Sequence, residues 1–183
     1  MENIVINTRR LILKSITPQV ITGLFSSKSR EEIMAFFGTD EKGYNHYKVM
    51  YELGMETHRI SLYFFLILAK ENNLPIGECG FHTLNKTHRR AELFYSLRNE
   101  NDKRKGYMTE ALNEVLEFGF TALGLHRIEA LVASQNMPSV KLLEKYGFTK
   151  EGTMREDYVV DGKNEDSDCY SLLRWEWARR PSS

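Results

Sequence analysis

In the stretch NDKRKGYMTEAL, residues 101–112, three basic residues stand directly before a glycine, and the residues after the glycine favour a helix. The first N–H groups of a helix have no partner within it, and the helix dipole adds partial positive charge there. Such a terminus binds anions, and glycine lets a ligand approach the backbone closely. Lys103, Arg104 and Lys105 would add charge attraction beside Gly106. The stretch is therefore a candidate phosphate site, with a solvated basic turn as the alternative.

Known nucleotide motifs do not account for this loop. It carries neither the P-loop pattern G-x-x-x-x-G-K-[ST] nor the dinucleotide pattern G-x-G-x-x-G. A purely structural role is also a poor explanation, because Lys and Arg oppose the dipole at a helix N-terminus. The spacing alone leaves anion binding and the basic turn equally open.

Ionisable side chains on expected strands form a second group of candidates. Glu78, Glu92 and Glu129 are carboxylates of this kind, and such groups are rarely buried without a partner. One that faces a cleft could act as a general base. His82 is a further candidate, since an unperturbed imidazole titrates near neutrality. For each of these residues, a solvated or ion-paired structural role is the alternative.

The elements that would position these residues follow from hydrophobic periods, caps and turn signals. Strands are expected at 10–16, 62–70, 76–84, 89–98 and 126–133, and two more on either side of an Asp161-Gly162 turn. The apolar run of residues 62–69 suits a buried strand. Helices are expected at 18–25, 29–37, 43–56, 106–123 and 136–148, with Ser29 and Glu32 as a capping box and Asn136 as an N-cap. We expect the last strand to place five residues on one face: Cys169, Ser171, Leu173, Trp175 and Trp177. This order predicts an α/β layer with a mixed sheet.

Composition limits the class of protein. A chain of 183 residues with 42% hydrophobic content predicts one domain, residues 1–183. Its 25 basic residues balance 25 acidic ones, which argues against bulk attraction to nucleic acid or to an anionic membrane. Two cysteines, Cys79 and Cys169, form no disulfide framework and have no zinc-ligand spacing. We therefore expect a cytoplasmic protein without a metal, a signal peptide or a membrane span.

The basic loop also resembles a known family pattern. Residues 103–108 are similar to the [Q/R]-x-x-G-x-[G/A] pyrophosphate loop of the GNAT N-acetyltransferases, and KGYMTEAL is similar to the GxGYxTEAL form of the RimJ/RimL-like branch. Two positions depart from the pattern: Lys103 stands where Gln or Arg is usual, and Met108 where Gly or Ala is usual.

Four other segments resemble the same branch in the same order. These are RRLILKSI, RRAELFYSL, HRIEALVASQNMPSVKLLEKYGF and EGTMRE…DGK…D…CYSLL, so that the resemblance covers about residues 8–175. It implies a GNAT-like fold, in which a mixed, mostly antiparallel sheet has a splayed central strand pair and is flanked by helices.

The resemblance further implies acetyl-CoA as the cosubstrate. Its pyrophosphate would lie on the N–H groups from Arg104 to Met108, and its pantetheine would run along strand 93–98. The residues implied for cofactor binding are Phe94, Tyr95, Ser96, Lys103, Arg104, Lys105, Gly106, Tyr107, Met108, Thr109, Asn136 and Ser139.

Catalytic roles are also carried over by family position. By that position, Ser139 would protonate the leaving thiolate, with a first-turn serine satisfied by the backbone as the alternative. The tyrosine that often has this role in GNAT enzymes is absent, since Leu143 occupies its place and Tyr146 lies three residues further along. Glu92 would be the general base. The acceptor would be a primary amine, and the mixed charges of residues 18–56 favour a protein N-terminus over a polyamine or aminoglycoside. A non-catalytic acyl-CoA-binding module is the alternative from another class, and a homodimer is left open.

Overall fold

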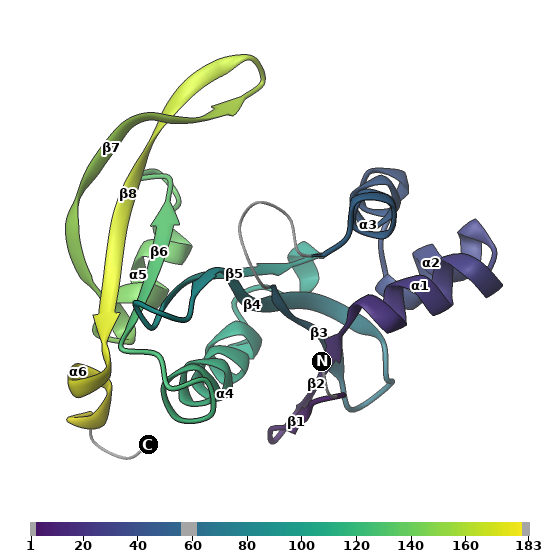
Figure 1. The fold of residues 1–183 in the computed structure, drawn as a ribbon, viewed down its shortest axis with the longest axis horizontal. Helices are drawn as coiled ribbons and strands as arrows, with labels where there is room; N and C mark the ends of the chain where they lie inside the picture. Colours follow the sequence, from purple (N-terminus) through teal and green to yellow (C-terminus); the bar gives the residue numbers. More distant parts are fainter. Residues whose placement is uncertain (1–2, 56–61, 181–183) are drawn as a thin grey trace. The chain divides into compact units, whose positions relative to one another are not determined.

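The computed structural model describes residues 3–55 and 62–180. The chain forms two compact units. Unit 1 comprises Met1–Leu84 and Phe94–Phe118, and unit 2 comprises Asn85–Leu93 and Gly119–Ser183. The strands are β1 (Val5–Asn7), β2 (Leu11–Ile16), β3 (Tyr63–Ala69), β4 (Pro75–Asn85), β5 (Arg90–Leu97), β6 (Arg127–Val132), β7 (Thr149–Val160) and β8 (Lys163–Leu173) (Figure 1). The helices are α1 (Pro18–Ser27), α2 (Arg30–Phe37), α3 (Glu41–Leu53), α4 (Tyr107–Thr121), α5 (Met137–Lys145) and α6 (Arg174–Ala178), with a 3-10 turn at Glu100–Asp102.

The hydrogen-bonded order of the strands is β1-β2-β3-β4-β5-β6-β8-β7. The pairs β1–β2, β2–β3, β3–β4, β6–β8 and β7–β8 are antiparallel, whereas β5 and β6 are parallel. The parallel ladder joins Arg90–Glu92 to Arg127–Glu129 and includes no later residue of the described chain. This confirms the predicted α/β fold with a mixed, mostly antiparallel sheet.

The core of unit 1 forms on both faces of β3. Phe64, Leu66 and Leu68 pack in one buried cluster with Ile21 of α1 and Phe37 of α2. Since alternate side chains of a strand point to opposite faces, Phe65 lies on the other face, where its ring meets Phe118 of α4 at 5.5 Å. The apolar run of β3 is therefore a doubly covered strand, as its sequence predicted.

Local caps fix where the helices of unit 1 begin. The Thr17 side chain accepts from the backbone N–H of Val20 ahead of α1, and Ser29 and Glu32 form the predicted capping box of α2. Asp40 caps α3, which begins two residues earlier than expected and ends at Leu53. Residue 56, the end of the predicted third helix, lies outside the described residues.

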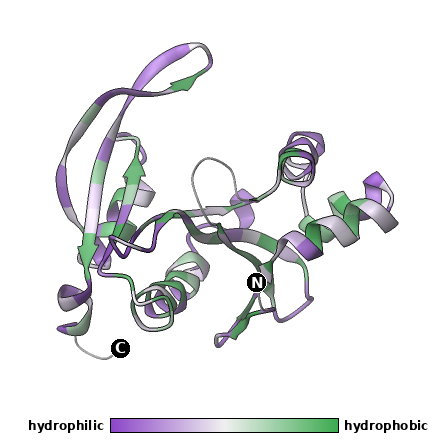
Figure 2. Ribbon diagram, viewed as in Figure 1, coloured by the Kyte–Doolittle hydropathy of each residue, from purple (hydrophilic) through white to green (hydrophobic). Residues whose placement is uncertain are grey.

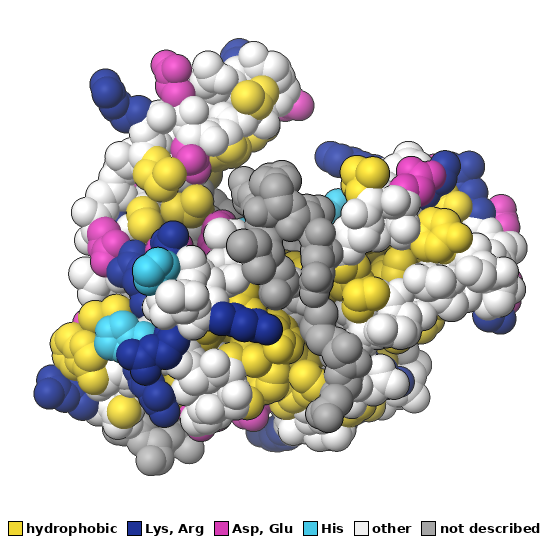
Figure 3. Space-filling view, viewed as in Figure 1, with side chains coloured by type: hydrophobic (Ala, Val, Ile, Leu, Met, Phe, Trp, Pro, Cys, Tyr) yellow, Lys and Arg dark blue, Asp and Glu magenta, His cyan; other side chains and the backbone are white. Residues whose placement is uncertain are grey.

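The outer surface of α1–α3 is mixed in character. Large apolar side chains are exposed there, among them Phe36, Val49 and Leu53. Figure 3 shows hydrophobic side chains over these helices with acidic and basic ones beside them.

In unit 2, β6 alternates buried and half-buried residues, and Ile128, Ala130 and Val132 face the core. The long β7–β8 hairpin turns at Asp161 and Gly162, which both have positive φ (49° and 77°) as a type I′ turn requires. Figure 2 shows that the outer part of this hairpin is largely hydrophilic. The predicted Asp161-Gly162 turn is confirmed.

The predicted end of the last strand is wrong. Strand β8 ends at Leu173, and Trp175 and Trp177 lie on the short helix α6. The Glu176 carboxylate accepts the backbone N–H of Leu173 at 2.8 Å, which satisfies a donor at the helix start and ends the strand pattern. The Trp177 ring stacks near Phe120 at 5.7 Å, while Trp175 is 48% exposed.

Candidate active site

The basic loop of unit 1 lies between β5 and α4 and turns through two left-handed residues. Arg104 has φ 61° and Gly106 has φ 78°. Left-handed residues between ordinary ones turn successive N–H groups toward one side, which is the geometry of anion-binding nests. The carbonyl of Gly106 accepts the N–H of Glu110 at 3.0 Å, so Gly106 caps α4 instead of lying in its first turn. The positive φ favours glycine here, whereas a Cβ at this position would meet only Arg10 Nη2, at an ordinary contact distance of 3.5 Å.

The three basic side chains of the loop are exposed. Lys103 pairs with Glu100 of the preceding 3-10 turn, which partly neutralises its charge. Arg104 and Lys105 follow directly, just before the positive end of the α4 dipole. The loop thus collects positive charge where a phosphate could accept from backbone N–H groups.

Met108, which departs from the family pattern, has a buried side chain. Only 8% of the residue is exposed, so its side chain packs inside unit 1. Tyr107 and Thr109 on either side of it are half-buried.

Arg10 of unit 1, which the sequence did not single out, holds this loop from a distant part of the chain. Its Nη1 donates to the carbonyl of Lys105 at 2.9 Å, and its guanidinium lies 4.6 Å from the centre of the Tyr107 ring. Its Nε donates to Glu110 at 2.7 Å. The only signal in the sequence was its place in the opening-strand segment RRLILKSI, which says nothing about its partners.

The C-terminal half of β5 carries Phe94, Tyr95 and Ser96. Phe94 is half-buried, and its ring lies 6.0 Å from Phe64 and 5.6 Å from His82. Ser96 is exposed, and its carbonyl lies only 2.4 Å from where a Cβ on Gly77 would stand. Gly77 is therefore needed for β4 to lie against this part of β5.

Glu78, one of the candidate bases, is engaged in a partly buried network. Its Oε2 accepts from the Tyr47 hydroxyl at 2.6 Å and from Arg98 Nη2 at 2.9 Å. Burial, and then the neighbouring carboxylate, raises the pKa of the Tyr47 hydroxyl, so this tyrosine stays a hydrogen-bond donor. The Glu78 carboxylate is thus held by Tyr47 and Arg98.

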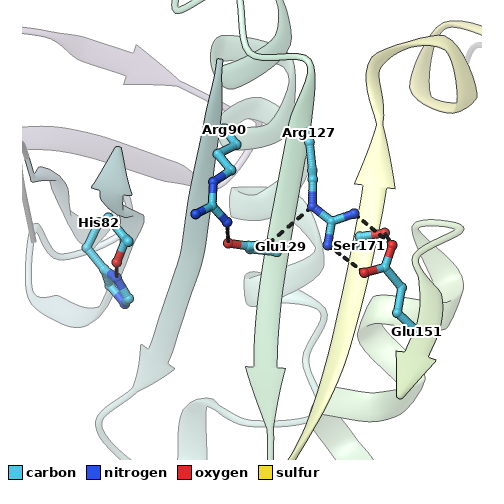
Figure 4. Close-up of polar contacts among 7 residues, drawn as sticks. His82, Arg90, Arg127, Glu129, Glu151 and Ser171 are labelled. Atoms are coloured by element: carbon cyan, nitrogen blue, oxygen red, sulfur yellow. Dashed lines mark hydrogen bonds and ion pairs between the residues drawn. The ribbon is translucent and has the colours of Figure 1, made fainter. Parts of the chain in front are cut away.

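Glu129 in unit 2 is likewise ion-paired (Figure 4). It accepts from Arg90 at 2.9 Å and from Arg127 at 3.1 Å. Arg127 also forms two parallel bonds to Glu151, of 2.7 and 2.6 Å. The hydrogen bond from Arg127, and then that from Ser171, lowers the pKa of Glu151 to about 2. This alternation of charges is typical of a structural ladder across strands.

Glu92 is half-buried and lies opposite Glu129 in the parallel β5–β6 register. Like-charged neighbours at such positions repel, and Arg90 and Arg127 offset that repulsion beside them.

His82 of unit 1 makes a 2.9 Å hydrogen bond with the hydroxyl of Thr83, a β-branched residue at φ 53° (Figure 4). Positive φ is uncommon for such a residue.

The second candidate region is the start of α5 in unit 2. Asn136 is the N-cap: its side chain accepts the N–H of Ser139 at 3.4 Å, as the sequence predicted. Asn136 is exposed and Ser139 is half-buried. Leu143 and Tyr146 are buried, with 1% and 2% exposed, so Tyr146 does not present its ring to solvent.

The predicted site residues thus fall into both units. Unit 1 holds Phe94, Tyr95, Ser96 and the loop from Lys103 to Thr109, while unit 2 holds Glu92, Asn136 and Ser139. Within unit 1 the structure brings the loop together with the start of α4. Within unit 2 it joins Asn136 to Ser139.

A family model for the acetyltransferase (GNAT) domain matches residues 10–149. The chain belongs to the GNAT acetyltransferases. It is 34% identical over 175 residues to the uncharacterized N-acetyltransferase YoaA of Bacillus subtilis, a match that covers 93% of this chain and 97% of that one. A spermidine N(1)-acetyltransferase of Vibrio cholerae is 31% identical over 116 residues, 63% of this chain and 66% of that one.

The fold agrees with solved GNAT structures. The ribosomal-protein-S5-alanine acetyltransferase from Vibrio fischeri matches with a TM-score of 0.71 at 22% identity, covering 98% of this chain and 100% of that one. Likeness at this identity supports the fold alone. Together with the family match, it confirms the resemblance that the sequence motifs indicated.

As a GNAT enzyme, the chain is an acyltransferase of a family that uses acetyl-CoA. The described residues contain no group of three or more His, Cys, Asp and Glu side chains suited to a metal ion. No helix within residues 3–55 and 62–180 is both long and apolar enough to cross a membrane.

Proposed function

We propose that this GNAT enzyme transfers the acetyl group of acetyl-CoA to the α-amine of a peptide or protein N-terminus. The observation that carries the cofactor assignment is the loop before α4, where Arg104 and Gly106 adopt left-handed conformations at a basic helix N-terminus. The pyrophosphate of acetyl-CoA would accept the backbone N–H groups from Arg104 to Met108. Lys103, Arg104 and Lys105 would add charge attraction, and the Thr109 hydroxyl would support the loop.

The remaining cofactor contacts follow the family pattern. The pantetheine would run along β5 beside Phe94, Tyr95 and Ser96 and would bond to the backbone. Asn136 and Ser139 at the start of α5 would lie near the thioester.

The reaction joins the acceptor nitrogen to the thioester carbon and breaks the carbon–sulfur bond. A neutral amine attacks, and the proton that it loses passes to a base or to water. The CoA thiolate leaves and takes a proton, which Ser139 would supply. Holding the two substrates in line provides much of the acceleration.

The ion pairs of two candidate base carboxylates favour an α-amine as the acceptor. Glu78 and Glu129 are both ion-paired, and Glu92 is the proposed base by its position in the family pattern. At pH 7.5 roughly a third of α-amino groups are already neutral, against about 0.1% of amines with a lysine-like pKa. An acceptor that is largely neutral needs little help from a base.

The charge distribution on the helices α1–α3 also favours an α-amine over a polycationic acceptor. A polycationic acceptor would be attracted by unpaired carboxylates. Here Lys28 pairs with Glu32, Arg30 with Glu41, and Lys48 with Glu52, so these carboxylates are neutralised.

A small-molecule amine is the second candidate, favoured by the spermidine N(1)-acetyltransferase among the relatives. A non-catalytic acyl-CoA-binding module is the candidate of a different class. The three proposals differ in which amine, if any, releases CoA.

An amine panel separates these candidates. The protein is incubated with acetyl-CoA and a peptide with a free N-terminus, the same peptide with a blocked N-terminus, spermidine, or no amine, and free thiol is followed. We expect the free peptide to give at least about ten times the kcat/KM of spermidine, with mass spectrometry placing the acetyl group on the α-nitrogen. Faster release with spermidine would assign a polyamine substrate. Tight CoA binding without release above the amine-free rate would support the binding module.

A further inference from the structure

Arg10 contacts the proposed pyrophosphate loop from a segment of unit 1 that is distant in sequence. It lies between β1 and β2, about a hundred residues before the loop in sequence. Its guanidinium contacts three groups at once: the Lys105 carbonyl, the Glu110 carboxylate and the face of the Tyr107 ring. One planar side chain therefore links the residue before Gly106 to the first turn of α4.

Glu110 is the counterpart of Arg10 in this arrangement. A carboxylate in the first turn of a helix that binds an anion would repel that anion. Here Glu110 is saturated: Oε1 accepts from Thr8 Oγ1 at 2.5 Å and from the backbone N–H of Arg10 at 2.6 Å, and Oε2 accepts from Arg10 Nε. Burial would raise the pKa of Glu110, but the bonds from Thr8 and Arg10 outweigh it and hold the pKa below its usual value. The carboxylate is thus ionised, and its charge is compensated by Arg10.

These contacts hold a loop that would otherwise be costly to order. The loop contains left-handed residues and three exposed basic side chains that repel one another. A binding loop that is ordered before its ligand arrives does not lose conformational entropy on binding.

We propose that Arg10, paired with Glu110, is a positioning residue that holds the loop 103–108 in its pyrophosphate-binding conformation. The proposal rests on the assignment of this loop to acetyl-CoA. Arg10 acts through Lys105, Tyr107 and Glu110, so its loss weakens binding of the pyrophosphate in particular. A merely structural arginine would instead weaken every part of the cofactor equally or affect stability alone.

Three ligands that differ in their phosphates test this role. Dissociation constants are measured for CoA and dephospho-CoA, which both contain the pyrophosphate, by calorimetry, and for pantetheine, which lacks it, by NMR titration. We expect Arg10→Ala to raise the Kd of CoA and of dephospho-CoA by about tenfold or more and to change that of pantetheine by less than about twofold. Arg10→Lys keeps the positive charge but loses the planar guanidinium group with its several donors. The Kd values of this variant for CoA and dephospho-CoA should lie between those of wild type and Arg10→Ala.

Arg9→Ala is the matched control, because Arg9 is the exposed neighbour of Arg10 and carries the same charge. It should leave all three constants near their wild-type values. Glu110→Gln serves where Arg10→Ala fails to fold, and should show the same selectivity for pyrophosphate-containing ligands.

The outcomes distinguish this inference from the proposed function. Wild-type protein that does not bind CoA would overturn both. If wild type binds CoA and Arg10→Ala binds it with the same Kd, the positioning role is overturned and the proposed function is left intact. The same holds if Arg10→Ala loses affinity equally for pantetheine and for CoA.

Discussion

Two helix starts carry the proposed function, and they are held in different ways. The start of α4 in unit 1 is fixed by Arg10 and Thr8, which lie about a hundred residues away in sequence. The start of α5 in unit 2 is capped by Asn136, its own neighbour. The loop before α5 also has an anchor, since Ser134 donates to Asp168 at 2.7 Å. The proposed anion-binding loop, which contains left-handed residues, is thus held directly by distant residues, whereas the proposed catalytic serine lies in a first turn with a local cap and only the loop before it has a distant anchor.

The largest effect is expected from Gly106→Val, which acts on the first of these two starts. A β-branched residue strongly disfavours φ 78°, so the loop would change conformation and misplace its N–H groups. We expect the Kd of CoA to rise by about a hundredfold or more in calorimetry. Gly152→Val is the control, because a Cβ at Gly152 meets nothing within 4 Å and the residue lies in β7. An unchanged Kd in Gly106→Val would contradict the anion-loop assignment.

Ser139→Ala tests the second start through catalysis. Loss of the proton donor should lower kcat by about a hundredfold or more and change the Kd of acetyl-CoA by less than about threefold, since general acid catalysis contributes roughly 10²–10⁴-fold. Steady-state kinetics and calorimetry separate these quantities. Ser139→Thr keeps the hydroxyl and should retain most of the wild-type kcat. Equal losses in kcat and in affinity would mean that Ser139 only positions the cofactor.

Asp168→Asn tests the anchor of the loop before α5. Hydrogen bonds from Lys150, Thr153 and Ser134, in that order, lower the pKa of the buried Asp168 to about 2 from its ordinary 3.8. A carboxyl whose pKa is lowered on folding stabilises the protein above its unfolded pKa, and this contribution is lost as the pH falls toward its folded pKa. The substitution should lower the free energy of unfolding at pH 7 by about 1–2 kcal/mol.

The pH dependence of Asp168→Asn supplies the check on that prediction. Urea unfolding between pH 6 and 2 should show a smaller loss of stability in the variant than in wild type over the interval from about pH 4 to pH 2. Parallel curves would show that Asp168 does not provide this part of the stability.

Asn136→Ala should have the smallest effect. Removing an N-cap costs typically about 1 kcal/mol, and the 3.4 Å length of this bond places the expected loss in the free energy of unfolding at about 0.5–1 kcal/mol. Thermal unfolding measures it, and Asn136→Asp, which keeps a capping oxygen, is the control. A loss several times larger would mean that Asn136 supports more than its own helix.

The sequence could predict those parts of the fold whose causes are local. The buried run of β3, the capping box of Ser29 and Glu32, the Asn136 cap and the Asp161-Gly162 turn all follow from periods and caps within a few residues. The basic loop before α4 was also found in this way, and the order of the motifs indicated the family correctly.

Long-range partners could not be predicted from the sequence. Neither the link from Arg10 to Glu110 nor that from Tyr47 and Arg98 to Glu78 has a spacing that a single sequence reveals. The same limit applies to the candidate bases. The sequence places Glu78 and Glu129 on strands, but it does not reveal the arginines that pair with them. The strand predicted through Trp177 was wrong because alternating apolar residues fit a short helix equally well once Glu176 caps it.

NMR titration of the backbone amides of Arg104–Met108 tests the central claim most directly. On addition of acetyl-CoA, we expect these amide resonances to shift with the ligand's own dissociation constant, while acetylpantetheine, which lacks the pyrophosphate, leaves them nearly unchanged. Acetyl-CoA that binds and shifts other amides, but not those of this loop, would contradict the claim that the start of α4 holds the pyrophosphate.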